Sequence, residues 1–275
     1  MSNADRDTVE GFGAEWSRFD QSALPEIEAR RLFDEYFQLF PWSALPTDAV
    51  GFDLGCGSGR WARFVAPRVK KLHCIDASAD ALAVAQRNLA GAPNCEFHAA
   101  SVDSMPIADG SMDFGYSLGV LHHVPDTAAG LRACVQKLKP GAPFLVYLYY
   151  AFDNRPAWFR ALWAASDAGR RVISRLPTPV RHAVAEVIAV TVYFPLARTA
   201  AVAEGLGVDV SNVPLTAYRH RAFYSMRTDA LDRFGTRVEQ RFTALQVKHL
   251  MEDAGLKNVV VSDEVPFWTA VGTRA

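Results

Sequence analysis

Three glycines at alternate positions, Gly55, Gly57 and Gly59, form the stretch of this sequence best suited to hold a ligand. They follow a short apolar run that contains Asp53 and precede a helical stretch that begins at Arg60. Glycine lets the backbone turn sharply and bring its N–H groups close to a ligand, and the N-terminus of the next helix adds partial positive charge. The pattern therefore favours a nucleotide-type ligand. The dinucleotide fingerprint would need its third glycine at position 60, which is Arg60 here.

A second carboxylate lies one βα unit further along the chain. The apolar run 71–76 ends in Asp76. In a doubly wound sheet, an acid at the end of the second strand is the usual partner of a ribose diol. Asp76 is therefore expected to bind ribose.

The segment 52–59, together with Asp76, resembles motif I and its sequel in the class I S-adenosylmethionine (SAM) methyltransferases, in their type 11-like, small-molecule branch. The stretches 112–123 and 138–141 match the same family, so the resemblance covers residues 11–150 well and the part from 240 onward loosely. It implies a transferase that uses SAM and releases S-adenosylhomocysteine, with no metal required. It also implies an α/β fold, a Rossmann-like doubly wound sheet of seven strands with the last one antiparallel.

The resemblance also implies a set of cofactor-binding residues. They are Trp16, Asp53, Gly55, Cys56, Gly57, Gly59, Asp76, Ala77, Ser101, Val102 and Leu118. Asp53 and the glycine loop suit the ammonium and carboxylate of the methionine half. Ser101 stands where the family usually has the acid that binds the adenine amine, and Asp103 follows two residues later, so the adenine contact is open between them. Trp16 either covers the cofactor or seals an edge of the core.

His122 and His123 follow the expected fourth strand, where ligands bind at the carboxyl edge of an open sheet. A histidine titrates near neutrality and can accept a proton from a nucleophile. In the similar phosphoethanolamine methyltransferases, a histidine of this loop aligns with His123, which makes His123 the catalytic candidate and His122 the weaker one. The alternative for both is a packing role. No H-E-x-x-H motif is present, and two adjacent histidines are not a metal ligand set.

Aromatic and basic residues supply candidates for binding the methyl acceptor. They are Tyr149, Tyr150, Tyr218, Arg219, Arg221 and Tyr224. A forked guanidinium suits a carboxylate or phosphate on the acceptor. The alternatives are that the tyrosines brace the fold and that the arginines form a solvated loop.

The apolar pattern predicts the elements that position these residues. Strands are expected at 50–53, 71–76, 95–100, 113–117, 144–150, 258–262 and 267–271, and helices near 127–138 and 243–254. Residues 1–275 are expected to form a single domain, in which 1–10 are disordered and 151–224 form a helical cap over the acceptor. The apolar run 180–204 is interrupted by charges and Pro195, so it is read as cap helices and not as a membrane span.

Composition limits the partners. The chain has 275 residues and a formal net charge of −1, so no overall field draws it to nucleic acid. Four scattered cysteines and a polar N-terminus indicate reduced thiols and a cytoplasmic protein. The expected function is methyl transfer to a small-molecule acceptor at O, N or C. An RNA or protein methyltransferase and a non-catalytic SAM- or nucleotide-binding module are the alternatives, and homodimer formation is left open.

Overall fold

The computed structural model describes residues 3–275, which form two compact units. The first unit, called the sheet unit below, consists of residues 3–21, 29–151 and 238–275. The second, called the helical unit, consists of residues 22–28 and 152–237.

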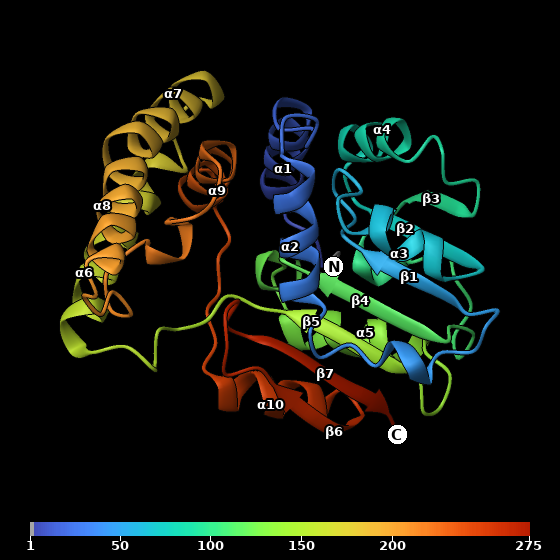
Figure 1. Cartoon of the computed structure of the whole chain (residues 1–275). Coiled ribbons are helices and arrows are strands. Elements are labelled where there is room, and N and C mark those ends of the chain that lie inside the picture. Colours follow the sequence, from blue (N-terminus) through green and yellow to red (C-terminus); the bar gives the residue numbers. More distant parts are fainter. Residues whose placement is uncertain (1–2) are drawn as a thin grey trace. The chain divides into compact units, whose positions relative to one another are not determined.

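The sheet unit is built on seven strands. They are β1 (Val50–Leu54), β2 (Lys71–Asp76), β3 (Cys95–Ala99), β4 (Phe114–Leu118), β5 (Pro143–Tyr147), β6 (Leu256–Val261) and β7 (Thr269–Arg274). Their order is β3-β2-β1-β4-β5-β7-β6, and Figure 1 shows this succession from one edge to the other. The first five strands are parallel, and β7 is antiparallel to both β5 and β6. The predicted fold class is therefore confirmed.

Helices precede and connect the strands of this unit. They are α1 (Arg6–Arg18), α2 (Glu26–Tyr36, which begins in the helical unit), α3 (Ala62–Val65), α4 (Ala79–Asn88), α5 (Thr127–Lys137) and α10 (Ala244–Asp253), with short 3₁₀ turns η1 (Trp42–Ala44), η2 (Ala66–Arg68), η3 (Val102–Ser104) and η4 (Leu121–His123). Side chains cap several N-termini. The carboxylate of Asp126 accepts from the N–H of Ala129 at the start of α5, and Thr243 and Gln246 form a reciprocal capping box on α10.

The N-terminal segment differs from the expectation of disorder over residues 1–10. Helix α1 begins at Arg6, and the Asp5 side chain caps it by accepting from the N–H of Thr8. The expectation is wrong for residues 6–10, because a cap and a tertiary contact order a polar segment that has little apolar pattern of its own. The Asn3 side chain hydrogen-bonds both the carbonyl and the N–H of Asp126. Residues 1–2 lie outside the described residues.

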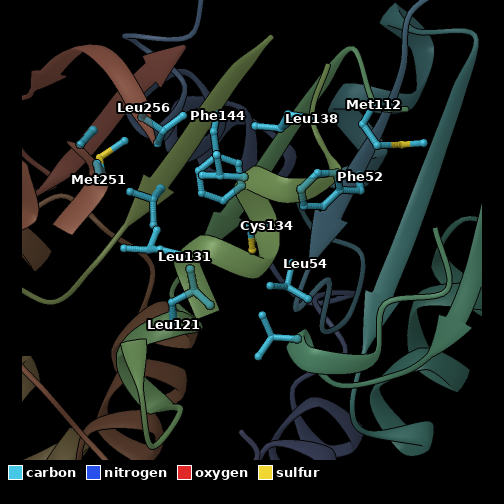
Figure 2. Packing of buried hydrophobic residues seen from close by; sticks show 14 of the residues in the cluster. Phe52, Leu54, Met112, Leu121, Leu131, Cys134, Leu138, Phe144, Met251 and Leu256 are labelled. Atoms are coloured by element: carbon cyan, nitrogen blue, oxygen red, sulfur yellow. The ribbon is translucent and has the colours of Figure 1, made fainter. Parts of the chain in front are cut away.

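One apolar core holds the sheet unit together. Phe52 and Leu54 of β1, Phe144 of β5 and Leu131 of α5 belong to one buried cluster, which extends to Met251 of α10. Figure 2 shows these side chains converging between α5 and the strands. Strands of a parallel sheet are covered on both faces, and β4 is accordingly buried at every position.

The helical unit contains α6 (Ala157–Ile173), α7 (Thr178–Ile188), the π-helical stretch η5 (Ala189–Tyr193), α8 (Phe194–Gly205), the 3₁₀ turn η6 (Thr216–Tyr218) and α9 (Phe223–Gly235). Its small core joins Ala189, Tyr193 and Ala197 to Met226 and Ala230 of α9. The helical content expected after the fifth strand is confirmed, but the expected end at residue 224 falls in the first turn of α9.

Charged residues explain why this unit extends beyond residue 224. The Arg227 guanidinium of α9 pairs with Glu186 of α7 at 2.7 Å. The buried Arg170 of α6 pairs with Asp167 at 2.6 Å and donates to the carbonyl of Thr236 at 2.9 Å. These contacts tie α9 and its end to the preceding helices.

The continuous helical run Thr178–Gly205 is the one helix among residues 3–275 that is long and apolar enough to cross a membrane. It has 28 residues and contains an 18-residue window of mean hydropathy 1.4. Only 28% of that window is buried, and the buried part includes Ala185, Ala189 and Ala197. Length and composition alone do not distinguish such a helix from one that packs inside a protein.

Candidate active site

The glycine loop adopts the backbone that its sequence predicts. Gly55, Gly57 and Gly59 have φ angles of 76°, 55° and 77°, in the left-handed region that favours glycine. A Cβ atom on Gly55 would lie 2.2 Å from Cγ2 of Val120, and one on Gly57 would lie 2.9 Å from the Trp16 indole. The loop is therefore packed tightly between the end of β4 and helix α1, and side chains at these positions would force it apart.

Asp53 is a buried acid in the middle of this region. Its side chain is 1% exposed, and neither carboxylate oxygen has a hydrogen-bond partner within the described chain. Burial raises the pKa of Asp53 well above its ordinary value, and the neighbouring Tyr116 hydroxyl offsets only part of that effect. The Tyr116 hydroxyl is likewise buried without a hydrogen-bond partner among the described residues. An acid in this state calls for a ligand that brings hydrogen-bond donors or positive charge.

We expect Asp53 to make the protein without ligand lose stability as pH rises. Because the folded pKa is raised, the unfolded chain releases this proton near pH ~3.9 while the folded chain still holds it. The free energy of unfolding should therefore fall from about pH 4 upward until the folded group also ionises. Asp53→Asn should flatten this fall, as measured by urea denaturation across pH, while Asp109→Asn, an exposed acid with a lowered pKa, should not. Parallel pH curves for wild type and Asp53→Asn would contradict the assignment.

Asp76 ends β2 and holds the glycine loop. One carboxylate oxygen accepts from the N–H of Gly57 at 2.9 Å, and the other accepts from the N–H of Ser78 at 2.8 Å. Burial raises the pKa of Asp76, and these two backbone hydrogen bonds act in the opposite direction. The carboxylate thus connects the first two strand ends at the carboxyl edge of the sheet.

The turn after β3 presents a third carboxylate. The Ser101 hydroxyl hydrogen-bonds the Asp103 carboxylate, which also accepts from the N–H of Asn3 at 3.1 Å. The Ser101 hydroxyl, first, and the Asn3 N–H lower the pKa of Asp103. Asp103 is therefore the ionised group here, and Ser101 orients it.

His123 is held in a defined orientation by a distant part of the chain. Its Nδ1 lies 2.6 Å from the carbonyl oxygen of Val238. A carbonyl only accepts, so Nδ1 carries the hydrogen, and Nε2 of the neutral ring is the nitrogen that can accept a proton. The ring is 4% exposed and lies 5.0 Å from the ring of Phe12, between centroids.

His122 lies in an aromatic stack. Its ring centroid is 3.8 Å from that of Tyr149 and 4.0 Å from that of His123. Burial lowers the pKa of His122 well below its ordinary value, and the positive charge of Arg241 acts in the same direction. The Arg241 guanidinium lies 5.0 Å above the Tyr149 ring and pairs with Glu239 at 2.8 Å. His122 is thus a neutral ring that packs against both Tyr149 and His123.

The family of this chain follows from its similarity to known proteins. Residues 52–146 match the model of the methyltransferase domain family. The ubiquinone biosynthesis O-methyltransferase of Xanthomonas campestris pv. campestris is 30% identical over 188 residues, which are 68% of this chain and 74% of that protein. The chain belongs to the class I SAM-dependent methyltransferases. The enzyme of the same name from Sodalis glossinidius is 33% identical over 122 residues, 44% of this chain and 48% of that one.

Solved structures support the fold of this methyltransferase. A putative methyltransferase of Haloferax volcanii, solved in complex with the Trm112 methyltransferase activator, is 14% identical with a TM-score of 0.52, and the match covers 99% of each chain. The SAM-dependent methyltransferase SibL in its apo form is 16% identical with a TM-score of 0.51, over 89% of this chain and 55% of that one. At these identities the likeness concerns the fold alone.

The residues of the methyltransferase suit SAM. The unpartnered Asp53 carboxylate matches the ammonium of the methionine half, and the close backbone of the glycine loop admits a ligand where a Cβ would not fit. That Asp76 binds the ribose diol stays a prediction. Of the other predicted cofactor residues, Cys56 and Leu118 are buried beside this edge, Val102 belongs to the core cluster, and Ala77 is exposed at the end of β2.

The predicted acceptor residues fall into two groups. Tyr149 lies against His122, whereas Tyr150 packs on Phe267 and Trp268 of the C-terminal hairpin, with ring centroids 5.3 and 5.8 Å away. The others belong to the helical unit. Arg219 makes a two-point contact with Glu204 at 2.8 and 2.9 Å, so its guanidinium fork is already occupied there.

The remaining acceptor candidates also make contacts within the helical unit. Tyr218 packs on Tyr193, with ring centroids 5.4 Å apart, and Arg221 donates to the carbonyl of Ala217 at 3.1 Å. Tyr224 lies in the first turn of α9, where its carbonyl accepts from the Thr228 hydroxyl at 3.2 Å. Their roles toward an acceptor stay predictions.

Three residues of the site were not found from the sequence. Tyr116 lies beside Asp53, Phe12 lies beside His123, and the carbonyl of Val238 fixes the His123 ring. Tyr116 stands in the expected fourth strand, where every second side chain faces the same side of the sheet. The sequence therefore gave a weak signal that Tyr116 belongs to the site. A backbone carbonyl 115 residues away gives none.

Proposed function

We propose that this methyltransferase transfers the methyl group to a hydroxyl oxygen of a small aromatic molecule. The observation that carries the proposal is the orientation of His123, whose Nδ1 is engaged by Val238 and whose Nε2 is thereby the proton acceptor. The rings of Phe12, His122 and Tyr149 surround it, which suits a planar acceptor. The relatives whose name specifies an O-methyltransferase support oxygen over nitrogen or carbon.

SAM, when bound, supplies a methyl group already activated by its sulfonium. The chain therefore has to bind and orient the two reactants, exclude water and move one proton. Asp53, Asp76 and the glycine loop hold the cofactor, and Trp16, packed on Gly57, covers that loop. His123 removes the proton of the acceptor hydroxyl at Nε2 and holds it as an imidazolium, while the Val238 carbonyl keeps the ring in place.

We further propose that the helical unit contributes to acceptor specificity. The chain leaves the sheet unit after Ala151, one residue beyond Tyr150, and returns at Val238, the residue that holds His123. The returning connection therefore begins beside the proposed catalytic histidine. The departing one begins two residues after Tyr149, whose ring centroid lies 5.4 Å from that of His123. Loops and insertions at the carboxyl edge of such sheets are where specificity resides.

Incubation with methyl-labelled SAM tests the proposed function. The acceptors would be a catechol, an aromatic amine, bulk RNA and a mixed protein extract, each offered separately, and product would be identified as methyl ether or methyl amine. We expect label in the catechol ether. Label in RNA or protein alone would replace the small-molecule acceptor, and label in the amine alone would replace oxygen. Binding of S-adenosylhomocysteine without turnover of any acceptor would favour a binding module.

A further inference from the structure

A cluster of two histidines and one glutamate lies on the edge of the sheet unit, on β2 and β3. His73 pairs in register with Glu96, and Ile75 pairs with His98. Because alternate residues of a strand share a face and paired residues of neighbouring parallel strands point the same way, His73, Glu96 and His98 project from one face. None of them belongs to the site described above.

The ligand atoms of these three side chains lie at spacings suited to one metal ion. Nδ1 of His73 and Nε2 of His98 are 2.9 Å apart. Carboxylate oxygens of Glu96 lie 3.8 Å from each of these nitrogens. Two ligands bonded at ~2.0–2.1 Å to a tetrahedral ion are about 3.3 Å from each other. Small rotations of the side chains would thus be enough to place all three around one ion.

The surroundings are compatible with such an ion. The His73 and His98 side chains are 10% and 15% exposed, and Glu96 is 46% exposed, so the imidazoles are sheltered while water can complete the coordination. The competitor is the Lys71 ammonium, which pairs with Glu96 but has a side chain that is 44% exposed and can move into solvent.

We propose that His73, Glu96 and His98 form a binding site for a divalent transition metal of the zinc class. Two imidazoles and one carboxylate are ligands of Zn²⁺, whereas Mg²⁺ and Ca²⁺ prefer oxygen alone. The ion would take the place of the hydrogen now shared between the two rings. It would also cross-link the edge strand β3 to β2, whose carboxyl ends lead to Ser101 and Asp76.

Titration of metal-free full-length protein with Zn²⁺ tests this site. We expect one equivalent to bind and to raise the melting temperature, because the ion binds the folded state only. His98→Ala and Glu96→Gln should each weaken Zn²⁺ binding at least ~10-fold. Lys71→Met should tighten it, because the competing ammonium is removed. His249→Ala, an exposed histidine on α10, is the matched control and should bind Zn²⁺ as wild type does.

Two results would overturn the proposal. One is the absence of stoichiometric Zn²⁺ binding, and the other is equal Zn²⁺ binding by wild type, His98→Ala and Glu96→Gln. Either result would mean that His73 and His98 are a hydrogen-bonded pair and not a metal site. Circular dichroism and S-adenosylhomocysteine binding report whether each variant is folded. Glu96→Gln, half-exposed and nearly isosteric, keeps the test valid should His98→Ala fail to fold.

Discussion

Replacing His123 by alanine is expected to slow methyl transfer by about 100- to 10,000-fold, the usual contribution of a positioned general base. The reason is that Nε2 of this ring is the proton acceptor, since Nδ1 is engaged by the Val238 carbonyl at 2.6 Å. The effect should fall on kcat, with little change in the affinity for S-adenosylhomocysteine, because the proton is moved only once the acceptor is bound. Steady-state kinetics and calorimetry measure the two quantities.

The pH dependence separates catalysis by His123 from packing. A general base acts in its unprotonated form, so the wild-type rate should rise with pH along a limb that His123→Ala lacks. A packing role would lower the rate at all pH values and keep that limb. His249→Ala, which removes an exposed histidine from α10, controls for the loss of an imidazole and should retain wild-type rates. Equal rates for wild type and His123→Ala at every pH would remove His123 from the mechanism.

Replacing Asp76 by alanine is expected to weaken S-adenosylhomocysteine binding by about 1.5–3 kcal/mol, or ~10- to 150-fold in the dissociation constant. The carboxylate is the expected partner of the ribose diol, and it also accepts from the N–H groups of Gly57 and Ser78. The substitution takes away a charged acceptor to which the ligand can donate. It also removes the hydrogen bond that holds the glycine loop at Gly57. Asp76→Asn, which keeps one acceptor oxygen, should have an intermediate effect.

Calorimetric titration of wild type, Asp76→Ala and Asp76→Asn with S-adenosylhomocysteine measures this effect. Asp109→Asn is the matched control, because it removes a carboxylate near the opposite end of β4, where Asp109 pairs with Lys137. Its dissociation constant should equal that of wild type. A dissociation constant for Asp76→Ala within twofold of wild type would show that the ribose is held elsewhere, and the assignment of this strand end would have to be abandoned.

The sequence alone determined the family and the sheet unit of this protein. Runs of about five apolar residues, ending in acids or glycines, predicted the strands around the cofactor, and the structure confirms the five parallel strands and the antiparallel β7. These signals are local. A buried parallel strand is mostly apolar, and the tight turn at Gly55–Gly59 uses glycine where φ is positive. Both features can therefore be read from consecutive residues.

The helical unit was predicted only in part. Its helical composition was readable, but its extension through α9 depends on ion pairs between helices, such as Arg227 with Glu186. Opposite charges close in sequence suggest pairing with each other, and the sequence does not show which of them face another helix. The ordering of residues 6–10 likewise depends on the contacts of Asn3 and the Asp5 cap.

Only the tertiary structure decided which distant residues became neighbours. Val238 meets His123 across 115 positions, the Cys74 thiol contacts both Cys56 and Cys95, and His73 meets Glu96 and His98 on the neighbouring strand. The sequence had shown these cysteines as scattered residues. Their proximity follows from strand order and register, which are set by the packing of the whole sheet against its helices and not by any one segment.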